Sequence, residues 1–133
     1  MKKLLVLFLS MASLVACSND DDNTEQGPDP IIGTWVLVDA SAPLNTQFCM
    51  DEESSLTFNS NQTGQAVFYL TGTNCTATNA PGTWKNNGNS NYIVTVQGLG
   101  DLEGSVNFSE NNTRFAFTTS VVGIPGTLTF EKQ

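Results

Sequence analysis

The sequence IIGTWVLV, residues 31–38, decides the fold that we expect for this chain. It combines β-branched and aromatic residues in one short run, which is typical of a β-strand. The tripeptide Gly-Thr-Trp returns at residues 82–84, and only Lys85 separates it from the polar cluster NNGNSN at residues 86–91. Outward from these two stretches, short apolar runs alternate with clusters of Asn, Ser, Thr and Gly.

Eight apolar runs predict eight strands. They are residues 31–38, 56–58, 66–70, 82–85, 92–96, 102–108, 114–118 and 127–130. The clusters between them are rich in Asn and Gly, which tolerate the positive φ angles of tight hairpin turns. Beyond the N-terminal segment, no run repeats with the 3.6-residue period of an amphipathic helix. We therefore expect an all-β antiparallel meander.

An eight-stranded meander removes its exposed edges by closing on itself. We accordingly expect residues 31–133 to form a small eight-stranded antiparallel up-and-down barrel. The interior of such a barrel is wide enough either to be filled by side chains or to hold one small ligand, and the sequence leaves both alternatives open. The side chains expected to point inward are Trp35, Leu37, Leu56, Phe58, Phe68, Leu70, Trp84, Val94, Val96, Val106, Phe108, Phe115, Phe117, Leu128 and Phe130. The candidate ligand-binding residues among them are Trp35, Phe58, Phe68, Trp84, Phe108 and Phe117.

Residues 1–16 have the features of an export signal. Met1-Lys2-Lys3 is positively charged, and the apolar run LLVLFL that follows is too short to span a membrane. The segment ends in Leu14-Val15-Ala16-Cys17, which resembles the bacterial lipobox. The resemblance implies cleavage before Cys17 and attachment of acyl chains such as palmitate, enough for a stable membrane anchor. The alternative is an ordinary signal peptide in which Cys17 only happens to lie near the cleavage site.

Residues 17–30 are expected to form an acidic, disordered linker behind the lipidated cysteine, because SNDDDNTEQGPDP offers almost no surface to bury. Asp20–Asp22 resemble the signal that sends lipoproteins to the cell surface in one group of Gram-negative bacteria. We therefore expect a lipid-anchored protein of the outer membrane, displayed on the cell surface. The alternative is an anchor that faces the periplasm.

Charge and composition exclude several functions. From Cys17 onward, thirteen acidic residues face only Lys85, Arg114 and Lys132, a net charge of −10. Such a surface repels nucleic acid and disfavours self-association, so we expect a monomer. The chain has no histidine, which excludes a Ser-His-Asp triad and a histidine-liganded zinc site.

The acidic residues of the expected loops do not form a catalytic constellation. The run Asp51-Glu52-Glu53 and the pair Asp101 and Glu103 have no nucleophile beside them and indicate solvated surface. We predict no catalytic residue, no metal, no cofactor and no enzymatic activity.

Cys49 and Cys75 remain as an even pair in an oxidising compartment. They fall in the loops after the first and third strands, and in a meander these two loops open at the same end. A Cys49–Cys75 disulfide is therefore predicted. The alternative, a redox or metal site, lacks a CxxC motif and a histidine.

The order of these features resembles the lipocalin-like domains of bacterial lipoproteins. The lipobox and acidic linker are followed by Gly33-Thr34-Trp35, Cys49, Leu56-Thr57-Phe58, Cys75 and Gly82-Thr83-Trp84. The resemblance implies that Trp35 closes the barrel floor under a cation, either Lys132 or Arg114. It also implies a membrane-anchored barrel that binds a small hydrophobic or amphipathic ligand. The alternative function is a structural or interaction module with a filled barrel, which binds a protein or glycan through its loops. Unlike true lipocalins, the chain has no C-terminal helix in its sequence pattern.

Overall fold

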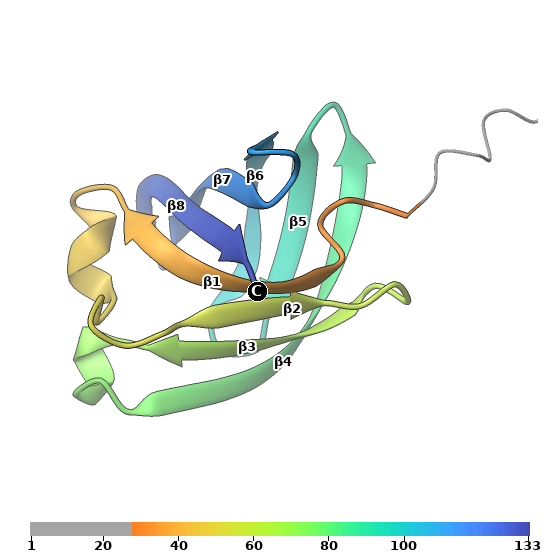
Figure 1. The fold of residues 1–133 in the computed structure, drawn as a ribbon. Coiled ribbons are helices and arrows are strands. Elements are labelled where there is room, and N and C mark those ends of the chain that lie inside the picture. The colour runs from red at the N-terminus through yellow and green to blue at the C-terminus, as the bar shows by residue number, and fades with distance from the viewer. Residues whose placement is uncertain (1–27) are drawn as a thin grey trace, which may run out of the picture.

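The fold is a closed antiparallel barrel of eight strands in sequence order, with β8 paired back to β1 (Figure 1). The structure is a computed structural model and describes residues 28–133. Its strands are β1 (Gly33–Ala40), β2 (Ser55–Phe58), β3 (Thr63–Tyr69), β4 (Ala77–Gly88), β5 (Asn91–Val96), β6 (Gly100–Ser109), β7 (Arg114–Val121) and β8 (Ile124–Lys132). The predicted all-β up-and-down barrel is confirmed. The export signal, Cys17 and Asp20–Asp22 lie outside the described residues.

Each predicted apolar run lies in or overlaps one strand, and the main difference concerns β4. This strand runs from Ala77 to Gly88, whereas the apolar run suggested only residues 82–85. Its first half contains Pro81, which lacks an N–H for the ladder and therefore gives no strand signal in a sequence. Two short 3-10 helices, η2 (Leu44–Gln47) and η3 (Thr71–Thr73), lie in the loops after β1 and β3. Neither they nor any other helix in the described part of the chain is long and apolar enough to cross a membrane.

Two glycines let the barrel wall bend between β2 and β5. Gly64 and Gly82 lie opposite each other in β3 and β4. A Cβ atom at Gly64 would collide with the carbonyl oxygen of Thr57, and one at Gly82 with that of Thr95. Glycine at these positions therefore allows neighbouring strands to approach more closely than any side chain would permit.

The core inside the barrel is one cluster of buried side chains. Thirteen of the fifteen expected inward residues are buried, and the other two, Leu70 and Phe108, pack partly buried against the core. Phe115 lies at the centre of an aromatic cluster, with its ring centroid 4.6 Å from that of Trp35 and 5.0 Å from that of Phe130. Edge-to-face and offset arrangements at such distances are favourable beyond the area they bury.

Candidate functional site

The six candidate ligand-binding residues all belong to the core that fills the barrel. Five are buried, and Phe108 is partly buried against them. Trp35 and Phe108 lie 6.2 Å apart, and Phe58 and Trp84 lie 6.0 Å apart, measured between ring centroids. Phe68 packs instead against Phe48, 5.8 Å away, from the loop after β1. All six side chains therefore pack within the core.

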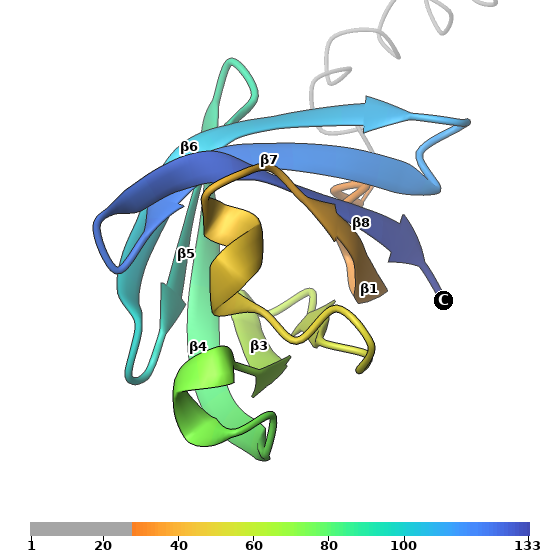
Figure 2. The ribbon, with the colours of Figure 1, turned by 90° about the vertical axis from the view of Figure 1, so that its left-hand side faces the viewer.

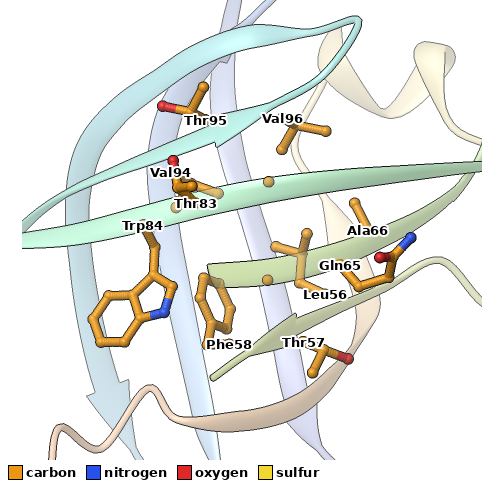
Figure 3. A pocket seen from close by; sticks show the side chains of 12 residues that line it. Leu56, Thr57, Phe58, Gln65, Ala66, Thr83, Trp84, Val94, Thr95 and Val96 are labelled. Atoms are coloured by element: carbon orange, nitrogen blue, oxygen red, sulfur yellow. The ribbon is translucent and has the colours of Figure 1, made fainter. Parts of the chain in front are cut away.

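Figure 3 shows the small space that remains between β2, β3, β4 and β5. Leu56, Phe58 and Trp84 point toward it, and the missing side chains of Gly64 and Gly82 contribute to it. Its volume is about 10 Å³. A cavity needs about 10–15 Å³ on this measure to hold a single water molecule. This part of the interior therefore has no room for an organic ligand.

Trp35 closes one end of the barrel, which we call the floor. Its indole N–H donates a 2.7 Å hydrogen bond to the carbonyl oxygen of Ile31, and the side chain is fully buried. Lys132 lies over the indole ring with Nζ 5.0 Å from the centroid, and it donates to the carbonyl oxygen of Ile32. Arg114 is occupied by an ion pair with Glu131. Lys132 is therefore the cation over Trp35.

Asp29 ties the chain entering the barrel to the floor. One carboxylate oxygen accepts hydrogen bonds from the Tyr92 hydroxyl at 2.7 Å and the Ile31 N–H at 3.0 Å, and the other accepts from Asn86 at 2.7 Å. Burial, followed by the hydrogen bond to Asp29 and its charge, raises the pKa of the Tyr92 phenol well above its ordinary value. Asp29 was expected to be linker, and Tyr92 was not among the expected inward residues. The polar sequence around Asp29 gives no sign that it reaches the barrel.

The loop after β1 closes the opposite end, which we call the mouth. Figure 2 views the barrel from this end, with η2 lying across the opening. Leu44 of η2 is fully buried, and Phe48 is 4% exposed. Leu44 lies directly over Gly126 of β8, because a Cβ atom built there would be 2.9 Å from its side chain. The sequence did not reveal this plug, since Leu44 and Phe48 are isolated apolar residues in a polar loop.

A disulfide and several hydrogen bonds hold the plug in place. Cys49 and Cys75 are bonded, with their Cα atoms 5.7 Å apart, as predicted. Beside the bridge, the Cys49 N–H donates to the Tyr69 carbonyl at 2.8 Å. The Thr71 hydroxyl donates to the Thr46 carbonyl at 3.0 Å. The mouth is thus closed by a segment fixed to the neighbouring loop.

The acidic residues singled out in the sequence are dispersed over the surface. Asp51, Glu52 and Glu53 are exposed in the loop at the mouth, and Glu103 is exposed on β6. Asp101 accepts a 2.8 Å hydrogen bond from the Thr95 hydroxyl. Among residues 28–133, no group of three His, Cys, Asp or Glu side chains could hold a metal ion.

Three recesses larger than the internal space lie on the outside of the barrel. One of about 420 Å³ runs between the β2–β3 turn and the outer faces of β4 and β5. One of about 290 Å³ continues along the same two strands, and both are lined by Thr83 and Thr95. The third, of about 260 Å³, surrounds the Arg114–Glu131 ion pair. Sequence reasoning missed the first two because outward threonines on a strand give no apolar signal.

Comparison with known proteins agrees with this architecture. A sequence model described as a lipocalin-like domain matches residues 31–117. None of the curated proteins compared with the chain matches it. Lipocalin-like proteins are typically non-enzymatic binding proteins, and their barrel is compatible with a small apolar ligand. Since the match covers more than half of the sequence and the barrel has the corresponding topology, the chain belongs to the lipocalin-like domain family.

Proposed function

We propose that this protein is a membrane-tethered binding module. Its side chains fill the barrel, and its outer surface binds the partner. The observation that carries the proposal is the filled interior, where the space between β2 and β5 measures about 10 Å³. Family membership supports a binding role. Because the interior is filled, we infer that the binding site lies on the outer surface.

The two closed ends support the same conclusion. A ligand entering at the mouth must displace Leu44 and Phe48, both buried in the core. Exposing each of these side chains costs about 1.5–3 kcal/mol, before any strain on the loop that the disulfide constrains. A ligand entering at the floor must displace Trp35 and the hydrogen bonds of Asp29.

We propose further that acyl chains on Cys17 supply the tether, and that Asp20–Asp22 direct the protein to the cell-surface side of the outer membrane. The lipobox pattern and the position of the acidic run support this. The chain enters the barrel at the floor through Asp29, so the wall and the mouth remain available to a partner.

The tether is tested by metabolic labelling with an alkyne analogue of palmitate. The native chain should be labelled and sediment with membranes, whereas Cys17→Ala should be unlabelled and unprocessed. Ser18→Ala is the matched control and should behave as the native chain. Protease treatment of intact cells should degrade the native protein and spare a variant in which Asp20–Asp22 are replaced by Asn. Labelling that persists in Cys17→Ala, or a native protein that resists protease in intact cells, would contradict the respective part of the proposal.

The filled barrel is tested by titrating the tryptophan fluorescence with oleate, retinol and haem. Trp35 and Trp84 both contribute to the core, so any ligand that entered would change their emission. We expect no saturable change. A saturable change of one ligand per protein would refute the proposal.

A second candidate function is binding of a small apolar ligand inside the barrel after the plug moves aside. It is favoured by the family and by the position of the plug, which is one loop fixed to its neighbour by the Cys49–Cys75 bond. Under this alternative, reducing the disulfide should greatly accelerate uptake of retinol. Under the filled-barrel proposal, reduction should produce no uptake while the protein stays folded.

A further inference from the structure

The two recesses that share Thr83 and Thr95 form a continuous groove along the outer faces of β4 and β5. At one end the groove contains Lys85 and Ile93, and at the other it contains Pro81 and Gln97. Thr83 and Thr95 are paired across the two strands and form the middle of its base. The larger recess alone, at about 420 Å³, lies within the usual size range of ligand sites.

The rim formed by the β2–β3 turn is held by hydrogen bonds. The Asn61 side-chain oxygen accepts from the N–H and the hydroxyl of Thr63, at 3.2 and 2.6 Å. The Asn59 side-chain amide donates to the Thr63 hydroxyl at 3.0 Å, and the backbone N–H of Trp84 donates to the Gln62 carbonyl at 3.0 Å. Because the turn is tied both to itself and to β4, the rim is ordered before any ligand arrives, which lowers the entropic cost of binding.

The lining is neutral apart from one cation, on a domain that is strongly acidic. Residues 28–133 contain nine carboxylates and three bases, yet no carboxylate lines the groove. Within residues 28–133, Arg114 forms an ion pair with Glu131, and Lys85 forms no ion pair. Asp101, just outside the groove on β6, accepts a hydrogen bond from the Thr95 hydroxyl, so the oxygen of Thr95 is oriented as an acceptor.

This chemistry selects among ligand classes. The acidic surroundings repel polyanions, and Lys85 repels a cation at the groove itself. A peptide cannot add as an extra strand between β4 and β5, because the two strands are already paired with each other from Gly82 to Gly88. The ligand class that fits this lining is a neutral molecule with many hydroxyl groups. Its hydroxyl groups can exchange hydrogen bonds with threonine, amide and ammonium groups, while its C–H faces contact Ile93, Pro81 and the threonine methyl groups.

We infer that the groove over β4 and β5 binds a neutral saccharide. This inference rests on the proposed function, because it assigns the outer surface a site and a ligand class. Thr83 and Thr95 contribute hydroxyl groups at its base, Lys85 donates hydrogen bonds at one end, and Asn61 and Gln62 form the side rim.

Saturation-transfer difference NMR on the mature protein in detergent micelles tests the inference. The probes are cellohexaose, maltohexaose, mannohexaose, xylohexaose and N-acetylchitohexaose, with hexagalacturonate as the anionic comparison. At least one neutral hexasaccharide should receive saturation, and hexagalacturonate should not. Thr83→Val preserves the shape of the side chain and removes its hydroxyl. For the saccharide that binds, it should raise Kd about fivefold, the equivalent of one hydrogen bond.

Matched variants separate the groove from the rest of the wall. Lys85→Met should also raise Kd, whereas Thr129→Val, an outward threonine on β8, should leave it unchanged. The inference is overturned if no neutral hexasaccharide binds, if hexagalacturonate binds more tightly, or if Thr83→Val and Lys85→Met have no effect. Its failure is distinguishable from failure of the proposed function, because the filled barrel is tested separately by entry of oleate, retinol or haem, and the tether by labelling and protease treatment.

Discussion

Truncating Leu44 to alanine tests whether the plug is part of the core. The side chain is fully buried and lies over Gly126, which has no side chain to move into the vacated space. The backbone around Gly126 is held between β7 and β1, so the site cannot collapse easily. Leu→Ala at such a site costs about 3 kcal/mol of unfolding free energy. For a domain of this size that lowers the Tm by roughly 12–20 °C.

The assay is equilibrium urea unfolding of the oxidised protein, followed by tryptophan fluorescence. Met50→Ala is the matched control, because Met50 lies in the same loop and is 41% exposed. It should change the unfolding free energy by less than about 0.5 kcal/mol. Leu44→Ala should also allow benzene to bind and raise the Tm, as apolar cavities do when they stay dry. A loss below about 1 kcal/mol for Leu44→Ala would show that the plug is not packed as described and would reopen the mouth as a ligand entrance.

Three further predictions concern the disulfide, a hairpin turn and the floor. Replacing Cys49 and Cys75 together by serine should lower the unfolding free energy by about 3.5 kcal/mol, from the entropy of a loop of 26 residues, as measured by urea unfolding. Val122 and Gly123 in the β7–β8 turn have positive φ angles of 49° and 82°. Val122→Asn creates the Asn-Gly sequence that such a turn prefers, so it should raise the unfolding free energy by about 1 kcal/mol and raise the Tm. A Tm that falls would contradict that reading of the turn. Tyr92→Phe should cost about 1.5–3 kcal/mol, because the Tyr92 hydroxyl donates to the Asp29 carboxylate. Since the pKa of Tyr92 is raised on folding, its contribution is complete below the ordinary tyrosine pKa of about 10 and is lost at higher pH. Unfolding curves between pH 8 and 11 should show this loss in the native protein and not in Tyr92→Phe.

The strands could be predicted because they depend on signals local to the sequence, and the disulfide could be predicted because it follows from the order of the strands. Each strand combines a short apolar run with a turn cluster, and alternation alone placed most of the core correctly. Cys49 and Cys75 could be paired because a meander brings alternate loops to the same end. Lys132 could be placed over Trp35 only through the resemblance to lipocalins, since the two residues are almost a hundred positions apart.

The remaining features depend on contacts that no local pattern encodes. Leu44 and Phe48 are single apolar residues in a polar loop, and they become core only because the loop folds across the mouth. Asp29 sits in a stretch with the composition of a linker, yet its carboxylate accepts three hydrogen bonds at the floor. The groove requires Thr83 and Thr95 to be paired by register and faced by a turn from elsewhere in the chain. These features therefore depend on strand register and loop packing, which no local sequence pattern encodes.

The distribution of charge adds a reason why the wall is the surface to test first. Asp39, Asp51, Glu52, Glu53 and Asp101 lie toward the mouth. The floor carries Asp29, Glu110 and Glu131 together with the three bases Lys85, Arg114 and Lys132. Two of these bases are already engaged, Arg114 by Glu131 and Lys132 by Trp35. The mouth therefore repels anionic partners, and the floor receives the chain that leads to the tether. The groove over β4 and β5 combines a hydroxyl-bearing lining without carboxylates and a lysine that has no ion pair among residues 28–133, so a ligand recognised by hydrogen bonds meets little electrostatic opposition there.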